Sequence, residues 1–143
     1  MAAGIFNRLL RDNNIRDVRA ESAGVSAADG MRASPHAISV ARQHGIDLRR
    51  HRSRALTQEI VDGVDLTLTM TGRHWYDVTE FAPRKKVRML SNLADNGMGE
   101  DVHDPFGGSI DEYRNVYEQM RTAIERQLPE ILNLLERDVE DHS

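Results

Sequence analysis

Helix-like and strand-like segments alternate along nearly the whole chain, which restricts the folds that it can adopt. Apolar residues three or four apart mark helices, and apolar residues at every second position mark strands. The predicted order is helix 2–13, strand 18–23, helix 34–45, short helix 57–62, strand 64–70, helix 73–81, strand 86–90 and a long helix from residue 110. Such alternation is typical of a parallel sheet with helices on both faces. We therefore predict a three-layer α/β fold.

Several helix ends are specified by local signals. Ser34 precedes Pro35, which is the pattern of an N-cap followed by proline in the first turn, and Gly45 ends that helix. Ser109 and Glu112 have the spacing of a capping box at the start of the long helix. Pro129 is expected to kink or divide this helix near residue 128, because proline removes a backbone donor.

Composition limits the class of protein. The 143 residues fit one domain, assigned to residues 1–137, with a flexible acidic tail at 138–143. A hydrophobic content of 39% with 29% charged residues fits a soluble globular chain, and no segment resembles a signal peptide or a membrane span, so a cytoplasmic location is expected. The net charge of -4 argues against general affinity for nucleic acid. The chain has no cysteine, which excludes disulfides, thiolate metal sites and a cysteine nucleophile within it.

The loop from Asp101 to Ser109 is the strongest candidate for chemistry. It carries two carboxylates and an imidazole, followed by a proline and an aromatic ring, just before the long helix. Pro105 keeps Asp104 out of helical geometry, so its carboxylate is expected to be held in place. The alternative is that Asp-Pro-x-Gly-Gly forms only a turn.

Other candidates have plainer interpretations beside the functional ones. Four arginines surround His51, and this cluster is either a solvated loop or an anion contact: Arg49, Arg50, Arg52 and Arg54. Trp75, the only tryptophan, is interpreted as core rather than as a ligand platform. A metal site built from Asp101, His103 and Asp104 is disfavoured, because neighbouring loop carboxylates rarely converge on one ion and no other ligands stand at a telling spacing.

Taken together, these segments resemble the low-molecular-weight protein-tyrosine phosphatase family, including its bacterial branch of protein-arginine phosphatases. The residues that carry the resemblance are Met1 to Phe6, Ser22-Ala-Gly24, Ser34-Pro-His36, His51-Arg-Ser-Arg54, Asp65 to Thr71 and Asp104-Pro-Phe-Gly-Gly-Ser-Ile-Asp-Glu-Tyr113. Each motif is weak alone, but their order and spacing are specific. The resemblance implies a flavodoxin-like fold with a four-stranded parallel sheet, and neither a cofactor nor a metal.

The resemblance also implies roles for particular residues. Asp104 matches the family's general acid and base, and Phe106 matches the aromatic residue that lines the substrate cleft. Ser22, His51 and Arg54 match polar residues that support the phosphate-binding loop. The expected partner is a phosphorylated protein, or a phosphate or similar oxyanion. Thr71 after Met70, and the absence of an aromatic residue between Val25 and Ala33, favour phosphoarginine over phosphotyrosine.

The family's phosphate-binding loop, Cys-x5-Arg-Ser/Thr-Pro, has no counterpart in this chain. Met1 corresponds to the residue just after that loop, so the resemblance implies that the central first strand and the loop are both missing. We therefore predict that the chain itself hydrolyses no phosphomonoester. Either it is a fragment of an active phosphatase, or it is a non-catalytic relative that binds a phosphorylated or acidic partner through its arginines. Loss of a central strand would also leave exposed sheet edges through which the chain could form an oligomer.

Overall fold

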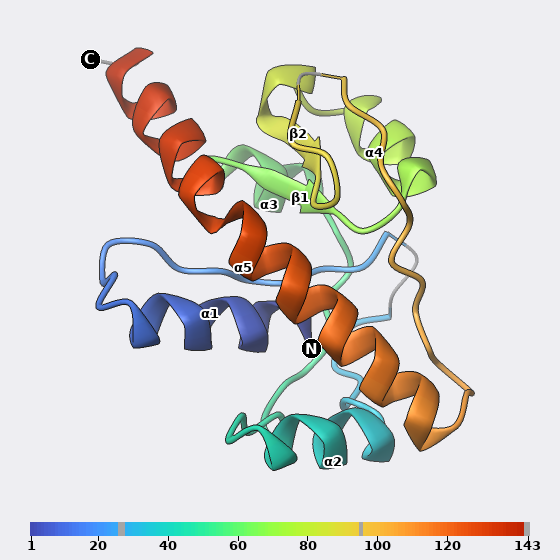
Figure 1. The fold of residues 1–143 in the computed structure, drawn as a ribbon. Helices are drawn as coiled ribbons and strands as arrows, with labels where there is room; N and C mark the ends of the chain where they lie inside the picture. Colours follow the sequence, from blue (N-terminus) through green and yellow to red (C-terminus); the bar gives the residue numbers. More distant parts are fainter. Residues whose placement is uncertain (26–27, 95, 142–143) are drawn as a thin grey trace. The chain divides into compact units, whose positions relative to one another are not determined.

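The computed structural model describes residues 1–25, 28–94 and 96–141, with side chains up to residue 136. Its helices and strands follow in the order α1 (Ala2–Asp12), α2 (Pro35–Gln43), α3 (Gln58–Asp62), β1 (Thr67–Thr69), α4 (Gly72–Thr79), a short 3-10 turn (Arg84–Lys86), β2 (Val87–Met89) and α5 (Ile110–Asp141) (Figure 1). The chain forms two compact units. Unit 1 comprises Met1–Ala55 and Asp104–Glu125, and unit 2 comprises Leu56–His103 and Arg126–Ser143.

Unit 1 is built on helices whose ends form as their local residues predict. The Ser34 hydroxyl accepts a hydrogen bond of 3.2 Å from the Ala37 N–H, which caps α2, and Pro35 occupies the first turn. After α2 the chain turns through Gly45 at a φ of +76°, a left-handed conformation that suits glycine. The cap and the turn therefore fix the length of α2.

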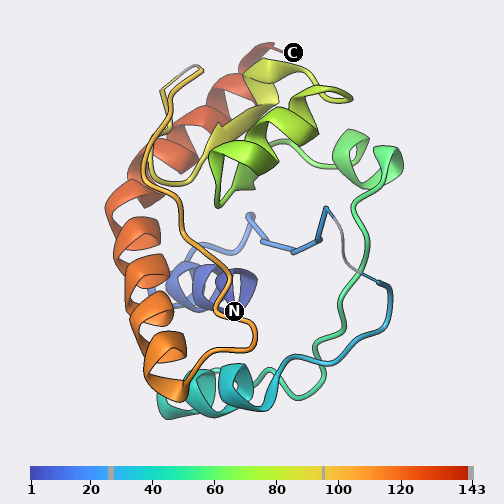
Figure 2. The same ribbon diagram turned by 90° about the vertical axis from the view of Figure 1, so that its right-hand side faces the viewer.

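The core of unit 1 comes from one apolar face on each of its helices. Helix α1 buries Ile5, Phe6, Leu9 and Leu10, whose spacing puts them on adjoining stripes. In Figure 2, α1 lies beside the first half of α5, and residues of both helices line one cavity. Asp104, in the segment that leads into α5, interacts electrostatically with the Met1 amino group. This arrangement brings residues after 103 towards the start of α1.

Unit 2 contains a β-α-β motif. Strands β1 and β2 pair in parallel with Thr67, Leu68 and Thr69 opposite Val87, Arg88 and Met89, and α4 connects them (Figure 1). Parallel strands require such a crossover. Trp75 on α4 is only 2% exposed, and its indole N–H donates a 3.1 Å hydrogen bond to the Val87 carbonyl. The prediction that Trp75 belongs to the core is confirmed.

The sheet has fewer strands than the sequence pattern predicts. Within the described residues it consists of β1 and β2 alone, each shorter than its predicted range. Residues 18–23 form no strand, which corrects the prediction, and only an isolated parallel bridge joins Gly24 to Ala55. The reason is that a strand exists through ladder hydrogen bonds, whereas both backbone groups of Ala20 bond to the Asn7 side chain, at 2.8 and 2.9 Å.

Helix α5 is continuous across Pro129. It runs from Ile110 to Asp141, so a division near residue 128 does not occur, while a kink there stays a prediction. Proline removes one backbone hydrogen bond, and the bonds on either side are enough to continue the helix. Residues 138–141, expected as a tail, continue this helix, while residues 142–143 lie outside the described part.

Candidate functional site

The Asp104 carboxylate lies near the amino end of α1. Burial lowers the pKa of the Met1 amino group, and the negative charge of Asp104 raises it, so the two groups interact electrostatically. Both belong to unit 1. The N–H groups of a first helical turn also favour negative charge, which makes this end of α1 a suitable place for an anion. The predicted acid therefore interacts with the amino end of α1.

His51 faces the same amino end. Its pKa is lowered first by burial, then by the positive charge of the Met1 amino group and then by Arg52. The imidazole is half-buried, and its backbone N–H donates a 3.1 Å hydrogen bond to the Leu48 carbonyl. The loop thus holds an imidazole of lowered pKa within electrostatic reach of the start of α1.

Arg54 fastens the segment that contains Ser22. Its Nε donates to the Ser22 carbonyl at 3.0 Å, and its Nη2 donates to Glu21 Oε2 at 2.8 Å. The Gly24 N–H completes the link by donating to the Arg54 carbonyl at 3.0 Å. The pKa of Glu21 is lowered chiefly by its hydrogen bonds with Arg54 and Arg19. Two of the three predicted support residues, Ser22 and Arg54, are therefore in direct contact.

The loop that carries Asp104 is internally braced. Asp104 Oδ1 accepts a hydrogen bond of 3.0 Å from the Phe106 N–H, and the Gly108 N–H donates to the Pro105 carbonyl at 2.8 Å. Gly107 takes a φ of +81°, which completes the turn. Phe106 is 82% exposed, so its ring is available for contact with a ligand. The turn interpretation and the functional interpretation are compatible, because the turn is what orients Asp104.

Both ends of this loop are anchored. At its start, Asp101 Oδ1 accepts a 2.9 Å hydrogen bond from the Gly72 N–H, and the Val102 N–H donates to the Met70 carbonyl at 2.8 Å. At its end, the Ser109 hydroxyl accepts from the Glu112 N–H at 3.2 Å, as the capping box predicts.

The four arginines around His51 do not converge into one patch. Arg49 forms a two-pronged ion pair with Asp47, with N–O distances of 3.0 and 2.9 Å. Arg52 donates through Nη1 to the carbonyls of Arg49 and His51. Since Arg54 is paired with Glu21, two of the four positive charges are offset by carboxylates of the chain.

A cavity of about 390 Å³ lies over the amino-terminal half of α1 and has Ser22, His51 and Arg54 among its lining residues. Asn7, which sequence reasoning missed, also lines it and bonds both backbone groups of Ala20. No local pattern marks an asparagine inside a helix as a partner of a distant segment. Asp104 and Phe106 do not line this cavity. The structure thus groups the three support residues in one place.

Neither a metal site nor a membrane-spanning helix is found in the described part of the chain. No group of three His, Cys, Asp or Glu side chains there is placed to hold a metal ion. The carboxylates of Asp101 and Asp104 instead accept backbone hydrogen bonds. Among the same residues, no helix combines the length and apolarity needed to cross a membrane.

Comparison with known proteins identifies relatives along nearly the whole chain. The family described as low molecular weight phosphotyrosine protein phosphatase matches residues 1–141. A protein-arginine-phosphatase of Bacillus subtilis is 35% identical over 140 residues, which cover 96% of this chain and 89% of that protein. The low molecular weight protein-tyrosine-phosphatase Wzb of Escherichia coli is 34% identical over 118 residues, covering 82% of this chain and 78% of Wzb.

A solved structure is also similar in fold. The low molecular weight protein tyrosine phosphatase from T. tengcongensis superposes with a TM-score of 0.81 at 31% identity, covering 90% of this chain and 88% of that one. The predicted flavodoxin-like class is therefore confirmed, although the chain itself forms only two paired strands among its described residues.

Proposed function

Because this chain belongs to the low-molecular-weight phosphotyrosine protein phosphatase family, we propose that it provides the acid loop and the phosphate-site support of a protein phosphatase. The observation that carries the proposal is the interaction of Asp104 with the amino end of α1, on which His51 also acts. A helix amino end attracts a phosphoryl group, and a carboxyl group beside it can exchange a proton with the leaving atom.

The family's chemistry proceeds through a phosphocysteine. A thiolate attacks phosphorus and forms an S–P bond, while the P–O or P–N bond to the leaving group breaks. We assign to Asp104 the proton that the leaving oxygen or nitrogen takes up, and in the second step the same carboxylate takes a proton from the water that breaks the S–P bond. The 143-residue chain contains no cysteine. The proposal therefore includes that the chain alone performs no such hydrolysis.

Ser22, His51 and Arg54 are proposed to support the phosphate site rather than to react. Arg54 is engaged with Glu21 and with the Ser22 carbonyl, so its role is to fix the segment at residues 21–24. His51 contributes an imidazole whose pKa is lowered by burial and by the Met1 amino group. Phe106, exposed two residues after Asp104, is proposed as the apolar contact for the substrate side chain.

Two proteins test the proposal. The mass-verified 143-residue protein should show no phosphate-competable turnover of a chromogenic aryl phosphate. A chimera that places the first strand and Cys-x5-Arg-Ser-Pro loop of the Bacillus subtilis relative before Met1 should be active. Turnover by the 143-residue protein, or an inactive but folded chimera, would contradict the proposal. Comparing phosphoarginine with phosphotyrosine peptides in the chimera then tests the expected preference for phosphoarginine.

The role of Asp104 is tested in the same chimera. D104N should lower kcat for a phosphopeptide by roughly 10²- to 10⁴-fold, the range for loss of a general acid. D111N is the matched control, because Asp111 is an aspartate of the first α5 turn whose side chain is 81% exposed. Equal kcat values for D104N and the unmutated chimera would remove Asp104 from the mechanism.

A second candidate function is binding of a phosphorylated partner without catalysis. The cavity of about 390 Å³ lined by His51, Arg52 and Arg54 favours it. Titration of the 143-residue protein with a phosphopeptide should then give saturable shifts at the arginine side chains and none with the unphosphorylated peptide. Since Arg49 and Arg54 already pair with carboxylates, R52Q should weaken binding more than R49Q. The absence of a saturable shift would rule against this function.

A further inference from the structure

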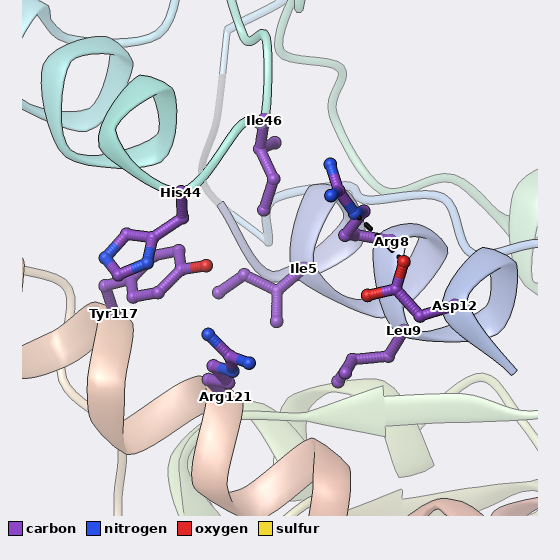
Figure 3. A pocket seen from close by; sticks show the side chains of 8 residues that line it. All are labelled: Ile5, Arg8, Leu9, Asp12, His44, Ile46, Tyr117 and Arg121. Atoms are coloured by element: carbon purple, nitrogen blue, oxygen red, sulfur yellow. Dashed lines mark hydrogen bonds and ion pairs between the residues drawn. The ribbon is translucent and has the colours of Figure 1, made fainter.

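A second cavity of unit 1 has no part in the proposed chemistry. It has a volume of about 180 Å³ and lies among α1, the end of α2 and the first half of α5 (Figure 3). A buried water needs roughly 10–15 Å³ of such space, so the cavity can hold a small molecule. It is below the roughly 300 Å³ typical of sites for drug-sized ligands, which sets an upper limit on ligand size.

Two arginines line this cavity, and each pairs with an acidic residue of its own helix. Arg8 Nε pairs with Asp12 at 3.2 Å, and Arg121 Nε pairs with Glu125 at 2.9 Å, in each case one turn further along the same helix. Arg8 is held again through Nη1, which donates to the Gly45 carbonyl at 3.2 Å. In Figure 3 the guanidinium of Arg121 extends from α5 towards Ile5. Asp12 and Glu125 thus limit the rotation of the two arginine side chains without help from a ligand.

Aromatic rings close one end of the cavity. His44 stacks on Tyr117 with the ring centroids 4.0 Å apart and the planes 13° from parallel. Burial raises the pKa of Tyr117, and Arg121 opposes this through its charge and a side-chain hydrogen bond, with a smaller opposing contribution from Arg8. Both guanidinium charges are therefore felt at the Tyr117 hydroxyl, inside the cavity.

The remaining walls are apolar, and the charges nearly balance. Ile5, Leu9 and Ile46 line the space between the two arginines (Figure 3). Asp12, the one carboxylate among the lining residues, pairs with Arg8, and Glu118 lies 3.8 Å from the lining residue His44. Glu125 offsets part of the charge of Arg121 from outside the lining. This balance suits a single negative charge better than a dianion.

We propose that this cavity binds a small monocarboxylate with a short apolar or aromatic body, its carboxylate lying between Arg8 and Arg121 and its body on Ile5, Leu9 and Ile46. Arginine pairs with planar carboxylates through two parallel hydrogen bonds, and the flat His44–Tyr117 stack can border a flat ligand. The site is separate from the cavity over the amino-terminal half of α1 and does not depend on the proposed phosphatase function.

Benzoate is the probe, titrated into the 143-residue protein and followed by the ring signals of Tyr117. We expect saturable shifts with a dissociation constant in the millimolar range, as a ligand of this size allows. Benzyl alcohol, which has the ring without the charge, and inorganic phosphate, which has the charge without the ring, should each bind at least about tenfold more weakly. Equal binding of benzyl alcohol, or no saturable shift at Tyr117, would overturn the proposal.

R121Q is the test variant, and R114Q is its matched control. The two arginines lie on α5, their side chains are 43% and 46% exposed, and each pairs with an acid of the same helix. R121Q should weaken benzoate binding about tenfold, whereas R114Q should change it by less than about twofold. If R121Q loses helical circular dichroism, R8Q replaces it with the same expected loss. Unchanged affinity in a folded R121Q or R8Q variant would also overturn the proposal.

Discussion

Burial lowers the pKa of the Met1 amino group and the Asp104 carboxylate partly opposes this, so an acid from the loop before α5 and the first residue of the chain lie within electrostatic reach. They are 103 positions apart in the sequence, by subtraction of their residue numbers. This relationship supports the assignment of Asp104 to a phosphate site at the start of α1. It also provides a direct measurement that does not require catalysis.

Replacing Asp104 with asparagine should lower the pKa of the Met1 amino group. The carboxylate stabilises the protonated amine, and its removal leaves burial and the remaining positive charges to act alone. The pH dependence of amine labelling by an electrophile measures this pKa, with the modified residue located by mass spectrometry. D111N should leave it unchanged, and a D104N midpoint equal to that of the wild type would mean that the two groups do not interact.

His51 should make the free energy of unfolding depend on pH. Burial and the Met1 amino group lower its pKa below the ordinary value of 6.5, so the unfolded chain binds the proton more tightly. The stability contributed is complete above the unfolded pKa and is lost as the pH falls through the lower folded pKa. The free energy of unfolding, measured with urea, should therefore fall less between about pH 7.5 and about pH 5.5 for H51Q than for the wild type. H103Q is the control, since His103 is an exposed loop residue, and should retain the wild-type loss.

Replacing Arg54 with glutamine should loosen residues 21–24. The change removes the bonds to Glu21 and to the Ser22 carbonyl, which are partly exposed and together contribute about 1 kcal/mol. Hydrogen exchange at the Gly24 amide should accelerate. R52Q removes bonds from Arg52 Nη1 to carbonyls of its own loop, so it should leave exchange at this amide unaffected. Equal exchange in both variants would argue against a bracing role.

Trp75→Phe should destabilise unit 2 by about 2–4 kcal/mol, because it leaves a void and removes the hydrogen bond to the fully buried Val87. Far-UV circular dichroism during urea unfolding measures the change without the tryptophan signal. Tyr76→Phe is the matched control, since that neighbouring ring is 59% exposed, and should shift stability by less than about 0.5 kcal/mol. A loss below about 1 kcal/mol for Trp75→Phe would show that the indole is not a core anchor.

Pro129→Ala should stabilise the protein, because the exposed proline stands inside α5 and deprives it of a backbone hydrogen bond. Proline costs about 3 kcal/mol relative to alanine in a regular helix interior, so a gain of about 1–3 kcal/mol is expected. Asn133→Ala, at another exposed position of α5, should add no more than about 0.7 kcal/mol. If the two variants gave equal gains in thermal unfolding, the proline would carry no special cost in this helix.

Most helices could be predicted because their signals lie within a few residues of each other. Ser34 caps α2, Thr57 caps α3, and both bonds are made to N–H groups three residues away. The strand predicted at residues 18–23 failed for the opposite reason. Its backbone needs a neighbour from elsewhere in the chain, and in the structure Asn7 satisfies part of it instead.

The candidate site divides in the same way. The sequence marked four site residues because their spacing resembles that of a known family: Asp104, Ser22, His51 and Arg54. Their catalytic and supporting roles stay predictions. For the arginine cluster the sequence left a solvated loop and an anion contact open, and only the structure shows Asp47 and Glu21 pairing with two of its members. Charges that are close in sequence add to one potential only when no carboxylate pairs with them.

The sequence alone therefore determined where most helices begin, the lack of a cysteine and the position of an acid loop before the last helix, since each depends on adjacent residues or on composition. Only the tertiary structure decided that Asp104 reaches the start of α1, that residues 18–23 form no strand, and that Arg8 and Arg121 share a cavity. These features depend on contacts between residues far apart in the chain, which hydrophobic periodicity does not specify.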